Sequence, residues 1–170
     1  MPLIRYARRP LAHRQTPARL SSLAGDEFEG YASLFGVPDA GGDVVAPGAF
    51  TRSLRRRPAA QVRMLYQHSA AEPLGVWQEI TEDRRGLKVR GRLVLDVARA
   101  ADVRALFAAG ALNGLSIGFR TLRAQKAGGH RLLTEIELWE ISVVTFPLLA
   151  GSLVTAVGDD PHPRTLKEPS

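Results

Sequence analysis

Residues 87–95 read LKVRGRLVL, a stretch in which apolar and basic residues alternate. Lys88, Arg90 and Arg92 fall on one face of an extended chain, and four of the leucines and valines fall on the other. This alternation predicts a β-strand with one buried and one exposed face. Residues 76–81 predict a partner strand, joined to the first through EDRRG, a loop whose glycine suits a hairpin bulge. The two strands together indicate an antiparallel meander.

Other strands and two helices are predicted from similar patterns. A helix is expected at residues 97–109, with Asp96 as its N-cap and Gly110 as its C-terminal stop, and a shorter one at 49–54. Gly128-Gly129 predicts another hairpin turn. Further strands are expected at residues 28–35, 62–66, 115–122, 131–138, 139–145 and 153–157. Many short strands and few helices predict an α+β fold, a closed or nearly closed antiparallel β-barrel with a few surrounding helices.

The composition is typical of one globular domain. The chain has 170 residues, of which 45% are hydrophobic and 24% are charged, and folding at this length removes roughly two-thirds of the chain's surface from water. Prolines and arginines crowd the first twenty residues, and prolines interrupt the last thirteen. We therefore expect a basic flexible arm at residues 1–21, a folded domain at 22–157 and a flexible tail at 158–170.

The residue content also argues against several kinds of site. The chain has no cysteine, which excludes disulfides, thiolate metal ligands and a cysteine nucleophile. The four histidines lack the paired spacing of zinc ligands, so we expect no metal and no cofactor. No apolar run reaches the ~18 residues that span a bilayer, and residues 1–20 lack the apolar core of a secretory signal. We expect a cytoplasmic protein without a membrane partner.

Positive charge is concentrated at the N-terminus. The formal net charge is +6, and residues 1–20 contain five arginines and no acidic residue. Such an arm can make weak contacts to nucleic acid through counterion release, although short basic tails are often only solvated extensions. Aromatic residues are sparse beside the basic runs, which disfavours binding of single-stranded nucleic acid.

His68 and Ser116 are candidates for chemistry. His68 follows an apolar run and should lie at the end of a strand, where the backbone holds its imidazole in place. Ser116 stands between Gly114 and Gly118, whose small size leaves the hydroxyl unobstructed. Because this serine follows a helix and enters a strand, it does not fit the strand-to-helix elbow of α/β-hydrolases. Taken singly, purely structural roles for the histidine and the serine remain the alternative.

Five sequence blocks occur in a defined order along the chain. They are YQH at 66–68, PLGVW at 73–77, GLKVRG at 86–91, LSIGF at 115–119 and EISVVTFP at 140–147. Their order and spacing resemble those of the prohead (capsid maturation) serine proteases of tailed bacteriophages, and APGAF at 46–50 resembles an upstream segment of that family. The likeness covers about residues 27–157.

This resemblance implies the fold of the herpesvirus assemblins and the activity of a serine endopeptidase. It implies that the protein cleaves scaffold and major capsid protein, and itself, inside an assembling prohead in the host cytoplasm, where copies self-associate. Ser116 is then the nucleophile and His68 its base. A serine hydroxyl needs such a base, and the base needs a third group that fixes its tautomer.

Glu140 is the predicted third group. Glu135 and Glu137 are also available, but the block that contains Glu140 matches the family best. The assemblins have a histidine in this role, so the glutamate is a departure from their pattern. The resemblance also implies that the backbone of Leu148 or Leu149 stabilises the oxyanion.

Two other functions stay open. A non-enzymatic barrel could serve as a structural or nucleic-acid-binding component of a virus particle, with the arginines of residues 5–19 and 55–57 as contacts. A serine esterase that acts on small molecules would use the same nucleophile and base.

Overall fold

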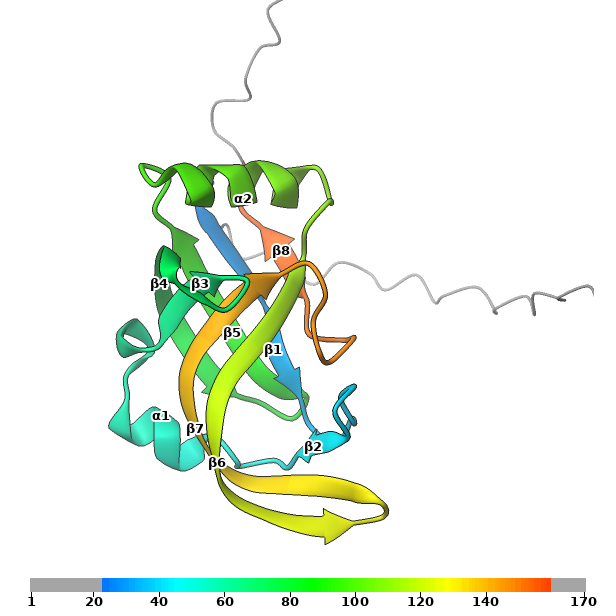
Figure 1. The fold of residues 1–170 in the computed structure, drawn as a ribbon. Helices are drawn as coiled ribbons and strands as arrows, with labels where there is room; N and C mark the ends of the chain where they lie inside the picture. The colour runs from blue at the N-terminus through cyan, green and yellow to red at the C-terminus, as the bar shows by residue number, and fades with distance from the viewer. Residues whose placement is uncertain (1–22, 160–170) are drawn as a thin grey trace, which may run out of the picture.

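The computed structural model describes residues 23–159, which form mainly strands with two short α-helices (Figure 1). The predicted arm at 1–21 and residues 160–170 of the predicted tail lie outside this range. The elements are β1 Glu27–Leu34, β2 Asp43–Val45, α1 Thr51–Arg56, the 3₁₀ turn η1 Ala59–Gln61, β3 Arg63–Tyr66, β4 Ser69–Glu82, β5 Gly86–Leu93, α2 Ala98–Ala108, β6 Gly114–Ala127, β7 His130–Val144 and β8 Val154–Val157. The α+β class is therefore confirmed.

All eight described strands belong to one sheet. Its order is β2-β7-β3-β4-β5-β1-β8, and β6 pairs with the other edge of β7. Helix α2 lies across one end of the sheet, and the β6–β7 hairpin extends from the opposite end (Figure 1). The long strand β7 organises the molecule, because β2 pairs with its beginning and β3 with its end.

The sheet differs from the antiparallel barrel that the sequence predicts. Strands β2 and β3 run parallel to β7, so the sheet is mixed. Parallel neighbours need long crossover connections, and a pattern of local alternation does not reveal which distant strands will pair in this way. The described strand order does not close on itself. A single isolated bridge between Gly114 and Leu153 links β6 to the segment before β8, so a closed barrel is not confirmed.

The predicted strand at residues 87–95 is confirmed as far as Leu93. Strand β5 buries Leu87, Val89 and Leu93, each with at most 2% of its surface exposed. It ends there because pairing with β4 ends at Leu93, and Leu95 is 44% exposed. The alternation thus predicts the buried face correctly, but the predicted strand extends past the observed end at Leu93.

Three aromatic rings join the sheet to helix α2 in the core. Phe28 of β1 packs edge to face against Trp77 of β4 and Phe107 of α2, with centroid distances of 5.5 Å and 5.2 Å. Edge-to-face pairs of this kind add to the stabilisation that burial alone provides. None of the helices within residues 23–159 is long and apolar enough to cross a membrane.

Several predicted boundaries are wrong. Residues 131–138 and 139–145 form the single strand β7, and β2 was not predicted. The N-cap of α2 is Val97, which makes no side-chain cap, and Asp96 precedes it. Gly110, Gly128 and Gly129 are confirmed as turn glycines, since all three have positive φ, whereas Gly86 has no positive φ and is the first residue of β5.

Candidate active site

His68 lies in a strained two-residue turn between β3 and β4. Tyr66 pairs with Ser69, and the intervening Gln67 and His68 have φ values of 50° and 59°. Hairpin turns with two positive φ values favour Asn-Gly, because in this conformation the Cβ of most residues lies too close to the following carbonyl oxygen, which costs roughly 1–2 kcal/mol per residue. Strain of this size persists only where the surroundings hold it, and it is concentrated at functional sites.

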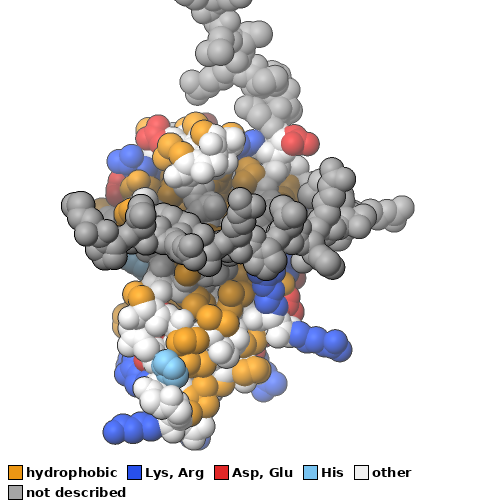
Figure 2. All heavy atoms as spheres, turned by 90° about the vertical axis from the view of Figure 1, so that its right-hand side faces the viewer, with side chains coloured by type: hydrophobic (Ala, Val, Ile, Leu, Met, Phe, Trp, Pro, Cys, Tyr) orange, Lys and Arg blue, Asp and Glu red, His pale blue; other side chains and the backbone are white. Residues whose placement is uncertain are grey.

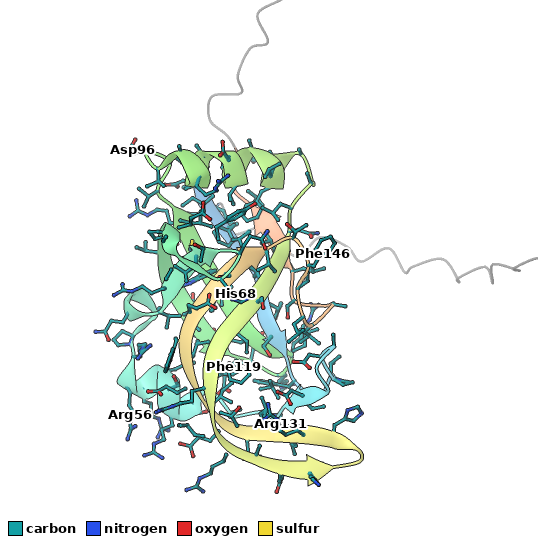
Figure 3. The ribbon with its side chains drawn as sticks, viewed as in Figure 1. Arg56, His68, Asp96, Phe119, Arg131 and Phe146 are labelled. Carbon is teal, nitrogen blue, oxygen red and sulfur yellow. The ribbon has the colours of Figure 1, made fainter. Side chains whose placement is uncertain are left out.

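Strand β7 holds this turn in place. The Gln67 N–H donates to the Val143 carbonyl at 3.0 Å, and the Gln67 side-chain amide donates to Thr145 Oγ1 at 2.7 Å. The His68 N–H donates to Ser142 Oγ at 3.0 Å. The Thr145 N–H in turn donates to Gln67 Oε1 at 3.4 Å. Four hydrogen bonds thus tie the turn to the end of β7 and to Thr145 just after it, and Figure 3 shows His68 beside β6 and β7.

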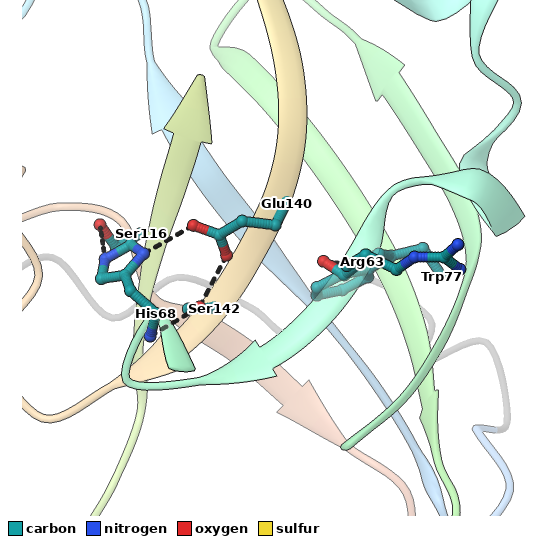
Figure 4. A network of polar contacts seen from close by, with 6 residues as sticks. All are labelled: Arg63, His68, Trp77, Ser116, Glu140 and Ser142. Atoms are coloured by element: carbon teal, nitrogen blue, oxygen red, sulfur yellow. Dashed lines mark hydrogen bonds and ion pairs between the residues drawn. The ribbon is translucent and has the colours of Figure 1, made fainter. Parts of the chain in front are cut away.

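Ser116 lies near the start of β6, directly opposite Ser142 of β7. Its Oγ is 3.0 Å from His68 Nε2. On the other side of the ring, His68 Nδ1 is 2.6 Å from Glu140 Oε1. Figure 4 shows the three side chains in sequence, serine to imidazole to carboxylate. The structure therefore brings together all three residues selected from the sequence.

The carboxylate determines which nitrogen of His68 carries the proton. An ionised carboxylate only accepts hydrogen bonds, so Nδ1 donates to Glu140 and Nε2 is left to accept the Ser116 hydroxyl. The side chain of Glu140 is 13% exposed and that of His68 46% exposed. The imidazole thus faces solvent, while the carboxylate that it contacts is shielded.

Gly118 makes room for the Glu140 carboxylate. The two residues are directly opposite each other on β6 and β7, and a Cβ at position 118 would overlap the Glu140 carboxylate. Next to this pair, β7 has one extra residue, Trp139, between its pairings with Gly118 and Phe119. Such bulges re-aim side chains and occur often beside active sites. The glycine therefore has a further role beyond leaving the serine unobstructed.

Glu135 and Glu137 are engaged elsewhere. Glu135 pairs with Arg52 at 2.9 Å and with Arg123 at 3.2 Å. Glu137 pairs with Arg120 at 2.9 Å, and its pKa is lowered by a hydrogen bond from the Trp139 side chain and by Arg120. Neither glutamate contacts His68 in the described structure.

Sequence comparison identifies the family. The profile described as caudovirus prohead serine protease matches residues 15–163. The chain belongs to this family. The prohead protease of Enterobacteria phage HK97 is 40% identical over 124 residues, which make up 71% of this chain and 55% of that protein. The chain therefore spans about half the length of this prohead protease.

Solved structures have the same fold at low sequence identity. The capsid assembly protease of bacteriophage T4 has a TM-score of 0.58 at 11% identity, over 69% of this chain and 80% of that one. The KSHV protease, solved with a hexapeptide phosphonate inhibitor, has a TM-score of 0.55 at 14% identity, over 75% of this chain and 63% of that one. The expected likeness of fold between this prohead protease family member and herpesvirus proteases is thus confirmed.

A small cavity adjoins Ser116 in this prohead protease family member. It has a volume of about 40 Å³, and its lining includes Phe119 of β6, Val37, and the loop residues Leu148 and Leu149. Val37 and Leu148 are 42% and 55% exposed. Figure 2 shows hydrophobic side chains gathered on the side of the molecule that lies at the right in Figure 1. The lining also includes Asp39, Asp43, Ser33 and Ser152, so the cavity beside Ser116 presents both apolar and polar side chains.

Sequence reasoning missed Ser142. This residue is fully buried, and its hydroxyl donates to Glu140 Oε2 at 2.6 Å while it accepts the His68 N–H. The pattern in the sequence that could have revealed it is the spacing in Glu140-Ile141-Ser142, because residues two apart on a strand share a face. Within residues 23–159, no three His, Asp or Glu side chains are arranged to hold a metal ion.

Proposed function

We propose that the protein is a serine endopeptidase with Ser116 as nucleophile, His68 as general base and Glu140 as the carboxylate that orients His68. The observation that carries the proposal is the unbroken series of contacts from Ser116 Oγ through both nitrogens of His68 to Glu140. Hydrogen-bonded serine, imidazole and carboxylate groups in this order are recognised by geometry and role, whatever their sequence positions.

In the proposed reaction, Ser116 Oγ attacks the carbonyl carbon of the scissile peptide bond as its proton passes to His68 Nε2. Glu140 stabilises the imidazolium that forms. The imidazolium then gives this proton to the leaving amine, and the C–N bond breaks to leave an acyl-enzyme. Water, deprotonated by the same imidazole, attacks the ester, and the proton returns to Ser116 as the acid product leaves.

The loop after β7 is proposed to stabilise the oxyanion. Leu148 and Leu149 line the same cavity as Ser116, and backbone N–H groups can stabilise a tetrahedral intermediate whatever their side chains. We also infer that the sheet curls into a nearly closed barrel. The Gly114–Leu153 bridge supports this inference, and it holds the end of that loop beside the strand of Ser116.

The proposed substrates are the major capsid protein and the scaffold of a prohead, and other copies of this chain. The support is membership of the prohead protease family and the name of the T4 structural relative, a capsid assembly protease. Action inside the assembling prohead, in the host cytoplasm, belongs to the same proposal, as does self-association of the protease there.

A fluorophosphonate probe tests the proposal directly, because it reacts with an activated serine. Wild-type protein should be labelled at Ser116, and Ser116→Ala and His68→Ala should lose both labelling and cleavage of co-expressed capsid protein while their circular dichroism stays unchanged. Labelling at another residue, or wild-type cleavage by Ser116→Ala, would contradict the assignment. A non-enzymatic barrel would not be labelled at all, and a panel of peptide and ester substrates separates a protease from an esterase.

A further inference from the structure

We infer that Ser142 is a positioning residue for this active site, holding Glu140 and the backbone of His68 in one fixed arrangement. The inference rests on the function proposed above, because it gives Ser142 a part in orienting the proposed base. Nothing in the Ser116–His68–Glu140 series requires a fourth residue, so the case depends on what the Ser142 hydroxyl contacts.

The Ser142 hydroxyl joins two parts of the site that are 72 positions apart in the chain. It donates its proton to Glu140 Oε2 at 2.6 Å and accepts the His68 N–H at 3.0 Å (Figure 4). A hydroxyl has one proton to donate and two lone pairs to accept with, so it can serve both partners at once. Ser142 thereby completes a closed ring of contacts: imidazole to Glu140, Glu140 to Ser142, and Ser142 to the histidine backbone.

This ring fixes the rotation of the carboxylate. The terminal torsion of a glutamate side chain is broad, so a carboxylate held at one oxygen alone can turn away from its partner. Ser142 holds Oε2, which leaves Oε1 directed at His68 Nδ1. A fixed Oε1 keeps the proton on Nδ1 and leaves Nε2 free to accept from Ser116.

The same hydroxyl supports the strained turn that carries the imidazole. His68 has a positive φ, and its N–H finds its acceptor in Ser142. Without that acceptor the turn loses one of the four hydrogen bonds that tie it to residues 142–145. The base and its orienting group would then move independently of each other.

Ser142 is not itself a second nucleophile. It is 0% exposed, and its proton is directed to Glu140, away from the imidazole nitrogen that takes the Ser116 proton. It lies opposite Ser116 on the neighbouring strand, so the two serines are adjacent and have different surroundings. Ser116 is therefore the serine placed to react, and Ser142 is a buried serine that positions Glu140 and His68.

The test compares Ser142→Ala with Ser53→Ala. Ser53 is a matched control, because it is also a buried serine, 6% exposed, whose Oγ accepts a backbone N–H of β7, that of Leu138 at 2.9 Å. Inactivation by the fluorophosphonate probe gives a maximal rate and a half-saturating concentration without knowledge of the natural substrate. Misplacement of catalytic groups by about 1 Å can lower a rate about 100-fold. We expect Ser142→Ala to lower the maximal rate ~10- to 100-fold and to leave half-saturation within about twofold.

A second readout reports positioning without any reaction. In ¹⁵N NMR, wild-type His68 should give the imidazole pattern of a single neutral tautomer with its proton on Nδ1, as should Ser53→Ala. Ser142→Ala should give averaged tautomers. Ser142→Cys keeps a similar volume with a weak donor and should behave like Ser142→Ala, so it can replace the alanine variant in both measurements if that variant fails to fold.

The outcomes separate the two proposals. If the wild type is labelled at Ser116 and Ser142→Ala keeps the wild-type maximal rate and tautomer, the positioning role is overturned and the proposed function stands. If the wild type is not labelled at Ser116, the proposed function fails and this role fails with it. Equal losses of rate in Ser142→Ala and Ser53→Ala would also overturn the positioning role, because destabilisation alone would then explain both.

Discussion

Gly118 is the residue at which the smallest substitution should have the largest effect on the site. A Cβ there would overlap the Glu140 carboxylate, which is the movable end of a side chain. The Cβ would also lie 2.7 Å from Glu140 Cγ, so the whole Glu140 side chain must take another rotamer. We expect Gly118→Ala to fold and the contact between Glu140 and His68 to be lost. Probe labelling of Ser116 should fall at least ~10-fold, by the same sensitivity to misplacement.

The control for Gly118 is a glycine at which an added Cβ would need only a small shift of one side chain. A Cβ at Gly41 would approach only Asp39 Oδ1, at 3.3 Å, so Gly41→Ala should be labelled at the wild-type rate. If Gly118→Ala were labelled at the wild-type rate, the reactivity of Ser116 would not depend on the position of the Glu140 carboxylate opposite Gly118.

Charge and tautomer control at Glu140 give a second prediction at this scale. Glutamine keeps the shape of the side chain but can present an amide donor to His68, which favours the wrong tautomer. The corresponding Asp-to-Asn change in a chymotrypsin-type triad lowers turnover by about four orders of magnitude. We expect Glu140→Gln to be severely impaired in cleavage of capsid protein but not fully inactive.

Glu137→Gln is the matched control in the same cleavage assay. Glu137 lies on β7, as Glu140 does, and pairs with the exposed Arg120 of β6, so its substitution should be nearly neutral. If Glu137→Gln were severely impaired in cleavage and Glu140→Gln nearly neutral, Glu140 would not be the carboxylate that orients His68.

At the scale of single elements, α1 depends on a residue from a distant strand. The helix has six residues and no side-chain cap of its own. Glu82 at the end of β4 supplies one, since its carboxylate accepts the Phe50 N–H at 3.0 Å and the Thr51 hydroxyl at 2.6 Å. Loss of a helix cap typically costs about 0.5–2 kcal/mol.

We therefore expect Glu82→Ala to lower the thermal unfolding midpoint by a few degrees without changing the labelling of Ser116. Thermal unfolding followed by circular dichroism measures the shift. Glu79→Ala, at an exposed position on the same strand, should unfold like the wild type. An unchanged midpoint in Glu82→Ala would show that α1 is held by packing alone.

The elements also show how far sequence alone could lead. Alternation located β5 and its buried face, and the turn glycines marked the β6–β7 hairpin correctly. Local patterns could not reveal that β7 continues through Trp139, because a bulge there leaves the strand unbroken. The cap of α2 was assigned to Asp96 on residue type, and the structure places Val97 at that position.

The site was predicted from resemblance more than from local pattern. Ser116, His68 and Glu140 come from three separate strands or turns, and only their family context indicated that they meet. The bulge at Trp139 puts Glu137 and Glu140 on the same face of the sheet, where simple alternation would put them on opposite faces. Their positions along β7, and not their facing, decide which of them reaches His68. The sequence does not reveal Ser142, because its contacts depend on how β7 and the β3–β4 turn are placed beside each other in the fold.

At the scale of the whole molecule, Glu27 links three strands. From β1 it accepts from Arg90 of β5 at 2.7 Å and from Gln78 of β4 at 2.7 Å, and it also accepts the Ala24 N–H at 3.0 Å. These hydrogen bonds, the one from Arg90 first, lower the pKa of Glu27 to about 2. The side chain is only 10% exposed, so solvent screens the interaction weakly.

The lowered pKa makes stability depend on pH in a defined direction. Because the folded pKa lies below the unfolded value of 4.5, Glu27 stabilises the fold fully above pH 4.5, and this contribution is lost as the pH falls toward 2. A shift of this size corresponds to up to about 3 kcal/mol of unfolding free energy. Asp43, whose pKa is lowered by its hydrogen bond from Arg131, contributes in the same direction.

We predict that Glu27→Gln lowers the unfolding free energy at pH 7 and flattens its fall in acid. Urea unfolding of the wild type at pH 7, 5 and 3 should show a loss between pH 5 and pH 3 that the variant shows only in part, because Asp43 still titrates in it. Glu29→Gln is the control on the same strand. The Glu29 carboxylate lies 3.9 Å from Lys88, a longer contact than that between Glu27 and Arg90, so this variant should keep the wild-type pH dependence. Since a glutamine at position 27 can still accept a hydrogen bond from Arg90 but carries no charge, parallel curves for Glu27→Gln and the wild type would mean that the charge of Glu27 does not hold β1 to the sheet.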